Sequence, residues 1–285
     1  MSDRTQWNET MKPVTADRLS LNTATVKTAW TLAQSIDGCA RHGIAGITPW
    51  RDVLQDMGVK QAARAIRDAG LTVSGLCRGG WYTAEGALTP QVLDDNKRAV
   101  DEAAAIDAEC LVMVVGGLAD GSRDLIAARS IVEEGLAHTL DYARDVGVPI
   151  AIEPLHPMYA ADRACINTMG QALDICDRLG SGIGVVVDVY HVWWDPEVHA
   201  QIRRAGKERL MGFQVCDWLL ETRDMLNDRG MMGDGIINIP DLRAAVEAEG
   251  FAGLVDVEIF SSNDWWKRDP DEVLKTSISR SFESC

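Results

Sequence analysis

The chain has 285 residues, of which 46% are hydrophobic and 25% are charged, a composition typical of a folded globular protein and not of a disordered chain. Its 43 acidic and 28 basic residues give a net charge of -15. Because this charge repels phosphate backbones and anionic lipid, we expect no nucleic-acid partner. The seven cysteines are scattered and include no C-x-x-C pair, so neither a disulfide framework nor a zinc site is predicted.

Residues 1–17 read as an irregular, polar opening. The first residues lack the basic and then apolar blocks of a signal peptide, and no stretch approaches about 18 uncharged apolar residues. We therefore expect a cytoplasmic protein that makes no membrane contact.

After this opening, short apolar runs rich in β-forming residues alternate with longer segments of helical periodicity. The eight expected strands are 19–23, 46–49, 72–77, 110–115, 149–155, 184–188, 211–216 and 253–260. The clearest helices between them are 61–69, 91–106, 124–146 and 242–249, each followed by Gly or Asp.

Strands that are apolar on both faces and alternate with helices indicate a parallel sheet covered by helices. Eight such units in one chain favour an α/β fold of the (β/α)8 TIM barrel type, with a single domain over residues 1–285. An open, doubly wound sheet is the alternative. The first expected strand leads into Asn-Thr-Ala-Thr-Val without a G-x-G-x-x-G turn, which disfavours a bound dinucleotide.

Polar side chains stand at the ends of the last four expected strands: Glu153, Asp188, Gln214 and Glu258. In a barrel these ends meet at one mouth, and a buried carboxylate is costly unless it is paired or bound to a cation. Each residue alone is equally well an ordinary strand-end or helix-capping residue, but four in register favour a shared site. Because all the donor atoms are oxygens, the pattern predicts one divalent metal ion, Mn2+, Mg2+ or Co2+ in preference to zinc.

Four further residues near these strand ends are candidates for substrate binding. His191 follows the sixth strand and is predicted to hold a substrate hydroxyl, with a structural histidine bonded to a loop carbonyl as the alternative. Trp193 would line the pocket or pack below it, and His156 lies in the loop after the fifth strand, where contacts that set specificity are common. Arg229 belongs to the long connection 217–235, which is either a lid with a clamping arginine or a flexible surface loop.

Taken together, these residues resemble the xylose isomerase-like barrel superfamily of sugar isomerases, epimerases and dehydratases, across nearly the whole chain. The matching pieces are Ile152-Glu153-Pro154, Asp188-x-x-His191, Gln214, Gly233-Asp-Gly235 and Glu258. Ketose epimerases of the superfamily have histidine where this chain has Gln214, whereas hydroxypyruvate isomerase-like members are similar in having glutamine. The AP endonucleases of this fold need a histidine-rich cluster and a basic surface, which this chain lacks.

The resemblance implies a divalent-metal-dependent isomerase or epimerase acting on a small sugar, keto-sugar or keto-acid. The metal ligands would be Glu153, Asp188, Gln214 and Glu258, and the two glutamates would also move the proton through a metal-held enediolate. The same enolate could expel a β-leaving group, so a lyase or dehydratase acting on a keto-sugar or inosose is the alternative. A non-catalytic sugar-binding barrel or an enzyme subunit is a third interpretation, and a homo-oligomer is compatible with such barrels.

Overall fold

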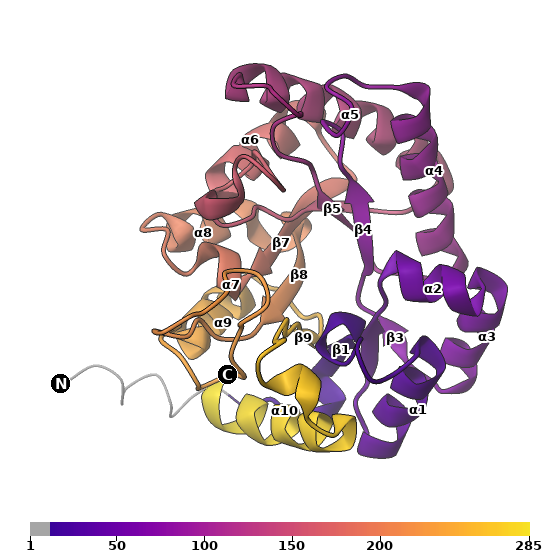
Figure 1. Ribbon diagram of the computed structural model, residues 1–285, viewed down its shortest axis with the longest axis vertical. Coiled ribbons are helices and arrows are strands. Elements are labelled where there is room, and N and C mark those ends of the chain that lie inside the picture. Colours follow the sequence, from indigo (N-terminus) through magenta and orange to yellow (C-terminus); the bar gives the residue numbers. More distant parts are fainter. Residues whose placement is uncertain (1–11) are drawn as a thin grey trace.

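The computed structural model describes residues 12–285, so the expectation for residues 1–17 lies partly outside the described residues. Nine parallel strands form one nearly closed barrel in the order β3-β2-β1-β9-β8-β7-β6-β5-β4. The strands are β1 (Leu19–Asn22), β2 (Gly46–Thr48), β3 (Thr72–Val73), β4 (Leu76–Gly80), β5 (Leu111–Val114), β6 (Ile150–Ile152), β7 (Ile183–Asp188), β8 (Leu210–Val215) and β9 (Val255–Val257). Figure 1 shows them at the centre of the molecule with the helices around them. The predicted (β/α)8 barrel is confirmed.

The one strand predicted at residues 72–77 is two strands in the structure, β3 and β4. The β3 strand pairs with β2, whereas β4 pairs with β5. The backbone changes its hydrogen-bonding partner at Ser74 and Gly75, between the two strands. Ser74 N–H donates to Ile47 on β2, whereas Leu76 N–H donates to Cys110 beside β5. The two pieces therefore share one position in the barrel, which explains how nine strands build an eightfold repeat.

Ten α-helices are found among residues 12–285, and local sequence signals begin and end most of them. They are α1 (Leu32–His42), α2 (Arg51–Met57), α3 (Val59–Asp68), α4 (Pro90–Ala105), α5 (Leu125–Val146), α6 (Met169–Leu179), α7 (Val189–Val192), α8 (Val198–Arg209), α9 (Ile239–Ala248) and α10 (Pro270–Ser284). Thr89 caps α4 with Pro90 at its first position, and Asp124 caps α5 by accepting two backbone N–H groups. None of these helices is long and apolar enough to cross a membrane.

The interior of the barrel has an apolar part and a polar part. The apolar cluster consists of Cys77, Cys110, Val112, Ala151 and Val186. The polar part consists of Ser20, Asn22, Thr48, Gln214 and Asp256, which are buried and come from strands β1, β2, β8 and β9. Buried polar side chains need partners from one another, so this half of the barrel forms a hydrogen-bonded layer.

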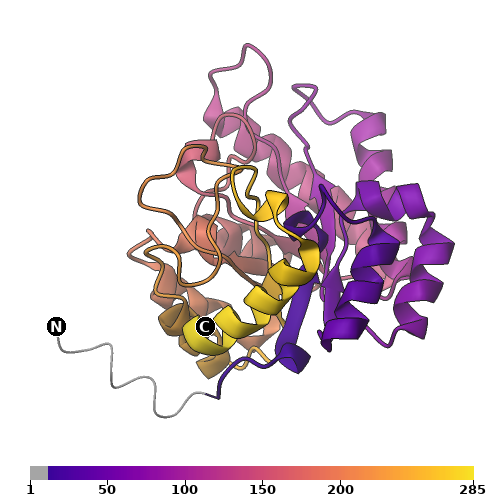
Figure 2. The ribbon, with the colours of Figure 1, turned by 60° about the horizontal axis from the view of Figure 1, so that its bottom comes forward.

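The long connection between β8 and α9 is packed onto the barrel at both ends, whereas most of residues 220–225 are exposed. Met231 and Met232 within it are fully buried. Its anchor is the Asp217 carboxylate, which accepts four backbone N–H groups, from Trp218, Gly233, Gly235 and Ile237, at 2.8 to 3.0 Å. A Cβ at Gly235 would lie 2.0 Å from the Trp218 carbonyl oxygen, so the tight turn around Asp217 requires glycine. Figure 2 shows this segment in orange over the carboxyl end of the barrel.

Asp217→Ala tests whether this carboxylate holds the connection in place. The substitution leaves four backbone N–H groups without their acceptor, so we expect the free energy of unfolding to fall by roughly 3 kcal/mol and the segment 218–236 to exchange its amide protons faster. Denaturant unfolding and hydrogen exchange measure the two effects. Glu221→Ala, in the exposed part of the same connection, is the matched control and should change neither. Equal exchange in both variants would contradict the role of Asp217.

Candidate metal and substrate site

The side chains of Glu153, Asp188 and Glu258 lie at the carboxyl ends of three strands, as the sequence predicts. Glu153 directly follows β6, Asp188 ends β7, and Glu258 directly follows β9. Their exposed fractions are 5%, 1% and 3%, so all three carboxylates are removed from solvent. The Glu153 N–H donates to Met113 and the Glu258 N–H donates to Val215, so both glutamates remain fixed in the register of the sheet.

The short helix α7 places His191 beside these carboxylates. Asp188 caps this helix by accepting the Tyr190 N–H at 2.8 Å, and His191 follows about one turn after Asp188. Ligand-type atoms of Glu153, Asp188 and His191 all lie within 4.8 Å of one another. The Asp188-x-x-His191 spacing therefore has a physical reason, because one turn of helix returns the imidazole to the face on which Asp188 lies.

Arg229 brings Asp188 and Glu258 together. Its Nη1 donates to Asp188 Oδ2 and to Glu258 Oε2, each at 3.1 Å. The guanidinium is 98% buried and is packed against the rings of Tyr190, at 4.3 Å, and Phe260, at 4.9 Å. The predicted clamp residue therefore binds two carboxylates of the protein itself.

Both ring nitrogens of His191 face hydrogen-bond donors. Its Nδ1 accepts the backbone N–H of His156 at 3.2 Å. Its Nε2 lies 3.3 Å from Arg229 Nη2, which can only donate, so this contact does not place a proton on Nε2. Burial, followed by the nearby Arg229 charge, lowers the His191 pKa well below its usual value, so the ring is neutral. Nε2 also lies 3.5 Å from Asp188 Oδ2 and 3.8 Å from Glu153 Oε1, a position that fits a metal ligand as well as the predicted substrate-binding role.

The three carboxylates are too many negative charges for one guanidinium. Burial raises the pKa of Glu153 well above its usual value, and the charges of Glu258 and Asp188 raise it further. Burial also raises the pKa of Asp188, and it raises that of Glu258 to about 8 although Arg229 opposes this shift. Three ionised carboxylates, one guanidinium and one divalent cation sum to zero charge. Ligand-type atoms of Glu153, Asp188 and His191 lie close enough together to hold a divalent metal ion, whereas the Glu258 carboxylate is outside this group and accepts hydrogen bonds from Arg229 and Asn22. A ligand role for Glu258 stays a prediction.

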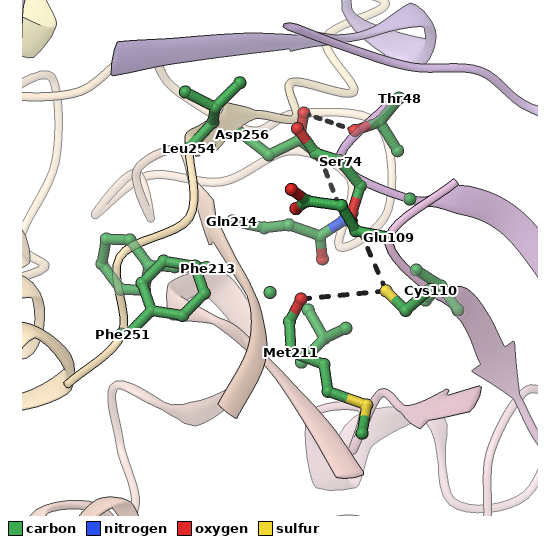
Figure 3. Close-up of a pocket in the computed structure, with 14 residues that line it drawn as sticks. Thr48, Ser74, Glu109, Cys110, Met211, Phe213, Gln214, Phe251, Leu254 and Asp256 are labelled. Atoms are coloured by element: carbon green, nitrogen blue, oxygen red, sulfur yellow. Dashed lines mark hydrogen bonds between the residues drawn. The ribbon is translucent and has the colours of Figure 1, made fainter. Parts of the chain in front are cut away.

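Gln214, the fourth predicted ligand, lies in the same layer of the barrel but is bonded to a different acid. It pairs in register with Asp188 on one side and with Asp256 on the other. Its Nε2 donates to Asp256 Oδ2 at 3.4 Å, and its Oε1 is buried without a hydrogen-bond partner among residues 12–285. Figure 3 shows Gln214 and Asp256 beside a cavity of about 20 Å3, which is room for about one water molecule. This cavity is not lined by Glu153, Asp188 or Glu258, and the ligand role of Gln214 stays a prediction.

Sequence reasoning missed Asn22 and Asp256, which support the site from below. Asn22 Nδ2 donates to Glu258 Oε1 at 2.9 Å and to Asp256 Oδ2 at 3.1 Å, and Thr48 Oγ1 donates to Asp256 Oδ1 at 2.9 Å. Burial raises the Asp256 pKa to about 6. Asp256 precedes Glu258 by two residues, so the period of a strand could have placed both on the same face.

The predicted His156 and Trp193 lie in a ring of aromatic side chains next to His191. The His156 ring is 5.1 Å from that of Trp218, which is 5.6 Å from the ring of Trp193. Burial lowers the His156 pKa, so this imidazole is also neutral at pH 7. Trp218, which the sequence analysis did not select, therefore joins the two predicted residues into one wall.

The known proteins that this chain resembles share the barrel. The family model of the xylose isomerase-like TIM barrel matches residues 36–280. The chain belongs to this family. Inosose isomerase from Halalkalibacterium halodurans is 26% identical over 156 residues, and this alignment covers 52% of the chain and 52% of that protein, so the comparison spans about half of each.

Two solved structures extend the comparison over nearly the full chain. Protein SMc04130 from Sinorhizobium meliloti 1021 has a TM-score of 0.91 and 52% identity, over 95% of this chain and 99% of that chain. The IOLI protein, solved with a bound zinc atom, has a TM-score of 0.78 and 19% identity, over 94% of this chain and 97% of that chain. At 19% identity, the similarity to the IOLI protein shows only that the two proteins have the same fold.

Arg229→Met tests whether the guanidinium compensates the buried carboxylates. The side chain keeps most of its volume but leaves Asp188 and Glu258 without a positive partner, so we expect metal-free protein to lose roughly 3 kcal/mol of unfolding free energy. Denaturant unfolding in the presence of a chelator gives this value. The exposed Arg203→Met is the control, and equal stability of the two variants would show that the buried pairs contribute nothing.

Metal binding is expected to release protons. In metal-free protein Glu258 has a pKa of about 8 and is mostly protonated at pH 6 to 7, but a carboxylate ligand must be ionised. The proton therefore competes with the metal below pH 8, and the apparent affinity should rise by at least about tenfold per pH unit between pH 6 and pH 8, because the pKa of Glu153 is raised as well. Calorimetric titration with Mn2+ at several pH values measures this slope. A constant affinity over the range would contradict the assignment of Glu258 as a ligand.

Proposed function

We propose that this protein is a divalent-metal-dependent isomerase or epimerase that moves a proton next to the carbonyl group of a small sugar-like substrate. The observation that carries this proposal is the convergence of two buried glutamates and Asp188 around one positive side chain. Such a site lowers the stability of the fold, because burying charged groups costs free energy unless other charges neutralise them. Clusters of this kind are therefore typical of functional sites. The half-length similarity to inosose isomerase supports the substrate class.

The metal would be held by Glu153, Asp188 and Glu258, with the free Oε1 of Gln214 as the fourth protein ligand. When bound, a divalent cation polarises a carbonyl oxygen and stabilises negative charge that develops on it. Oxygen donors favour Mn2+, Mg2+ or Co2+, and the zinc of the IOLI structure makes Zn2+ a further candidate.

Glu153 and Glu258 form the acid–base pair of this mechanism, and their surroundings differ. Glu258 is tied by Asn22 at Oε1 and by Arg229 at Oε2, whereas the Glu153 carboxylate makes no hydrogen bond within residues 12–285 and has a strongly raised pKa. A less constrained, more basic carboxylate is the better proton acceptor. We therefore assign the removal of the proton to Glu153 and its return to Glu258.

The remaining predicted residues position the substrate. His191 Nε2 lies 3.5 Å from Asp188 and 3.8 Å from Glu153, where it would contact a substrate hydroxyl. Arg229 keeps Asp188 and Glu258 in place, so it is a positioning residue. His156 and Trp193 belong to the aromatic wall on the His191 side and limit the size and orientation of the sugar.

Loss of the hydrogen next to a carbonyl is the step that isomerases, epimerases and β-eliminating lyases share. The protein is stripped of metal with a chelator and then loaded with Mn2+, Mg2+, Co2+ or Zn2+. We expect it to catalyse the entry of solvent deuterium into at least one substrate from a panel of ketoses, keto-acids and 3-keto-sugars. Glu153→Gln and Glu258→Gln should each lower the exchange rate by roughly 100-fold or more. NMR follows the exchange, and the product identifies an isomerase, an epimerase or an elimination.

Glu134→Gln, on the exposed face of α5, is the matched control and should exchange at the rate of the unchanged protein. Metal-dependent exchange that persists in both active-site variants would contradict the assigned glutamate pair. Absence of exchange for every substrate, with no metal bound at stoichiometric level, would contradict the proposed function as a whole.

A further inference from the structure

The mouth of the barrel contains three cationic side chains besides Arg229 that the mechanism does not use. Lys27 follows β1, Arg78 lies on β4, and Arg163 lies in the loop after β6, so all three come from the carboxyl side of the barrel. They stand out in a chain whose net charge is -15. Among residues 12–285, Lys27 and Arg78 form no ion pair with Asp or Glu, and Arg163 forms one, with its neighbour Asp162 at 3.7 Å.

Arg78 is a half-buried guanidinium between two indole rings. Its charge centre lies 4.6 Å from the ring of Trp81 and 5.9 Å from that of Trp50. No described residue forms an ion pair or hydrogen bond with its side chain, and burial lowers its pKa to about 10. Aromatic faces attract the charge, but they accept none of the five guanidinium N–H groups in a normal hydrogen bond.

Lys27 lies at the rim of the site, where it is more exposed than Arg78 but also lies between two aromatic rings. Its Nζ lies 4.7 Å from the ring of Phe260 and 4.4 Å from that of Trp266. Burial lowers its pKa, and its side chain makes no ion pair or hydrogen bond in the described part of the chain. The Phe260 ring also contacts Trp50, at 5.6 Å, which connects the surroundings of Lys27 to those of Arg78.

Arg163 extends this arrangement to the His191 side of the mouth. Its charge centre is 5.8 Å from the ring of Tyr159, which is itself 5.8 Å from the His191 ring. Within residues 12–285, the carboxylate that pairs with it is that of its neighbour Asp162, at 3.7 Å, which is too long for a hydrogen bond. Its Nε is buried and has no hydrogen-bond partner among residues 12–285.

Positive charge is therefore held at the entrance, above a site rich in carboxylates. Arg78 is half-buried, the Arg163 Nε is buried without a hydrogen-bond partner among residues 12–285, and Lys27 is exposed at the rim. A neutral sugar does not require this arrangement, because hydroxyl groups are bound as well by uncharged donors. An anionic group on the ligand supplies the acceptors that the three side chains lack and neutralises their mutual repulsion.

We propose that the substrate carries an anionic group, a carboxylate or a phosphate, and that Arg78 with Lys27 and Arg163 binds it while the reacting carbons lie at Glu153 and Glu258. This inference rests on the proposed function and narrows its substrate class to acidic keto-sugars, keto-acids or sugar phosphates. The aromatic side chains hold the cations in place and give the sugar-like part of the molecule a surface to pack on.

A matched set of substrates tests this proposal in the metal-loaded protein: a neutral ketose, the corresponding keto-sugar acid and the corresponding ketose phosphate. We expect kcat/KM for deuterium exchange to be at least about tenfold higher for one of the anions than for the neutral ketose. Arg78→Met keeps the apolar stem between the indoles and should abolish this preference, whereas Lys60→Gln, on the exposed face of α3, should keep it. The favoured anion tells a carboxylate site from a phosphate site.

A binding measurement separates this proposal from the proposed function. Inorganic phosphate, gluconate and the neutral polyol glucitol are titrated calorimetrically into chelator-treated protein at low salt. Saturable binding of an anion, at least about tenfold weaker in Arg78→Met and unchanged in Lys60→Gln, supports the anion site even if no substrate exchanges. Equal affinity in all three proteins, no binding of either anion, or equal exchange of neutral and anionic substrates would overturn it.

Discussion

The structure depends on the balance of charge around Arg229. Three carboxylates are buried within one end of the barrel, and the guanidinium of Arg229 bonds two of them at 3.1 Å each. Burial raises the pKa of Glu153 and Glu258, and the charges of neighbouring carboxylates raise it further; Arg229 opposes the shift at both residues, and Arg78 also opposes it at Glu153, without cancelling it. A divalent cation completes the balance, and the same imbalance provides basic carboxylates for moving a proton.

The barrel builds this centre by fixing its parts from several directions. Asn22 links Glu258 to the buried Asp256 below it, so the layer beneath the site is also polar and hydrogen bonded. From above, Asp217 gathers four backbone N–H groups of the connection that carries Arg229. The side chains at the centre are therefore held on strands and on a clamped turn, which keeps their geometry close to the one that chemistry requires.

The sequence predicted the barrel and three of the central residues because both depend on local, repeating signals. Buried strands alternate with helices, and in this fold a carboxylate at the carboxyl end of an apolar strand lies at the mouth of the barrel. The sequence did not predict that Arg229 bridges Asp188 and Glu258, since residues 188, 229 and 258 lie far apart in the chain and meet only through tertiary packing. The split at Ser74 and Gly75 was also missed, because a change of hydrogen-bonding neighbour leaves no mark in hydrophobic periodicity. Asn22 was not predicted to belong to the site, because a single polar residue at the end of a strand is also typical of a turn.

The most direct test of the charge-balance account is a crystal of the protein soaked in Mn2+ and measured at the manganese absorption edge. The account predicts one anomalous peak among the carboxylates of Glu153, Asp188 and Glu258, with Gln214 Oε1 turned toward it. Absence of a peak at this position, with Arg229 still bridging Asp188 and Glu258, would show that the guanidinium alone serves the site and would contradict the account.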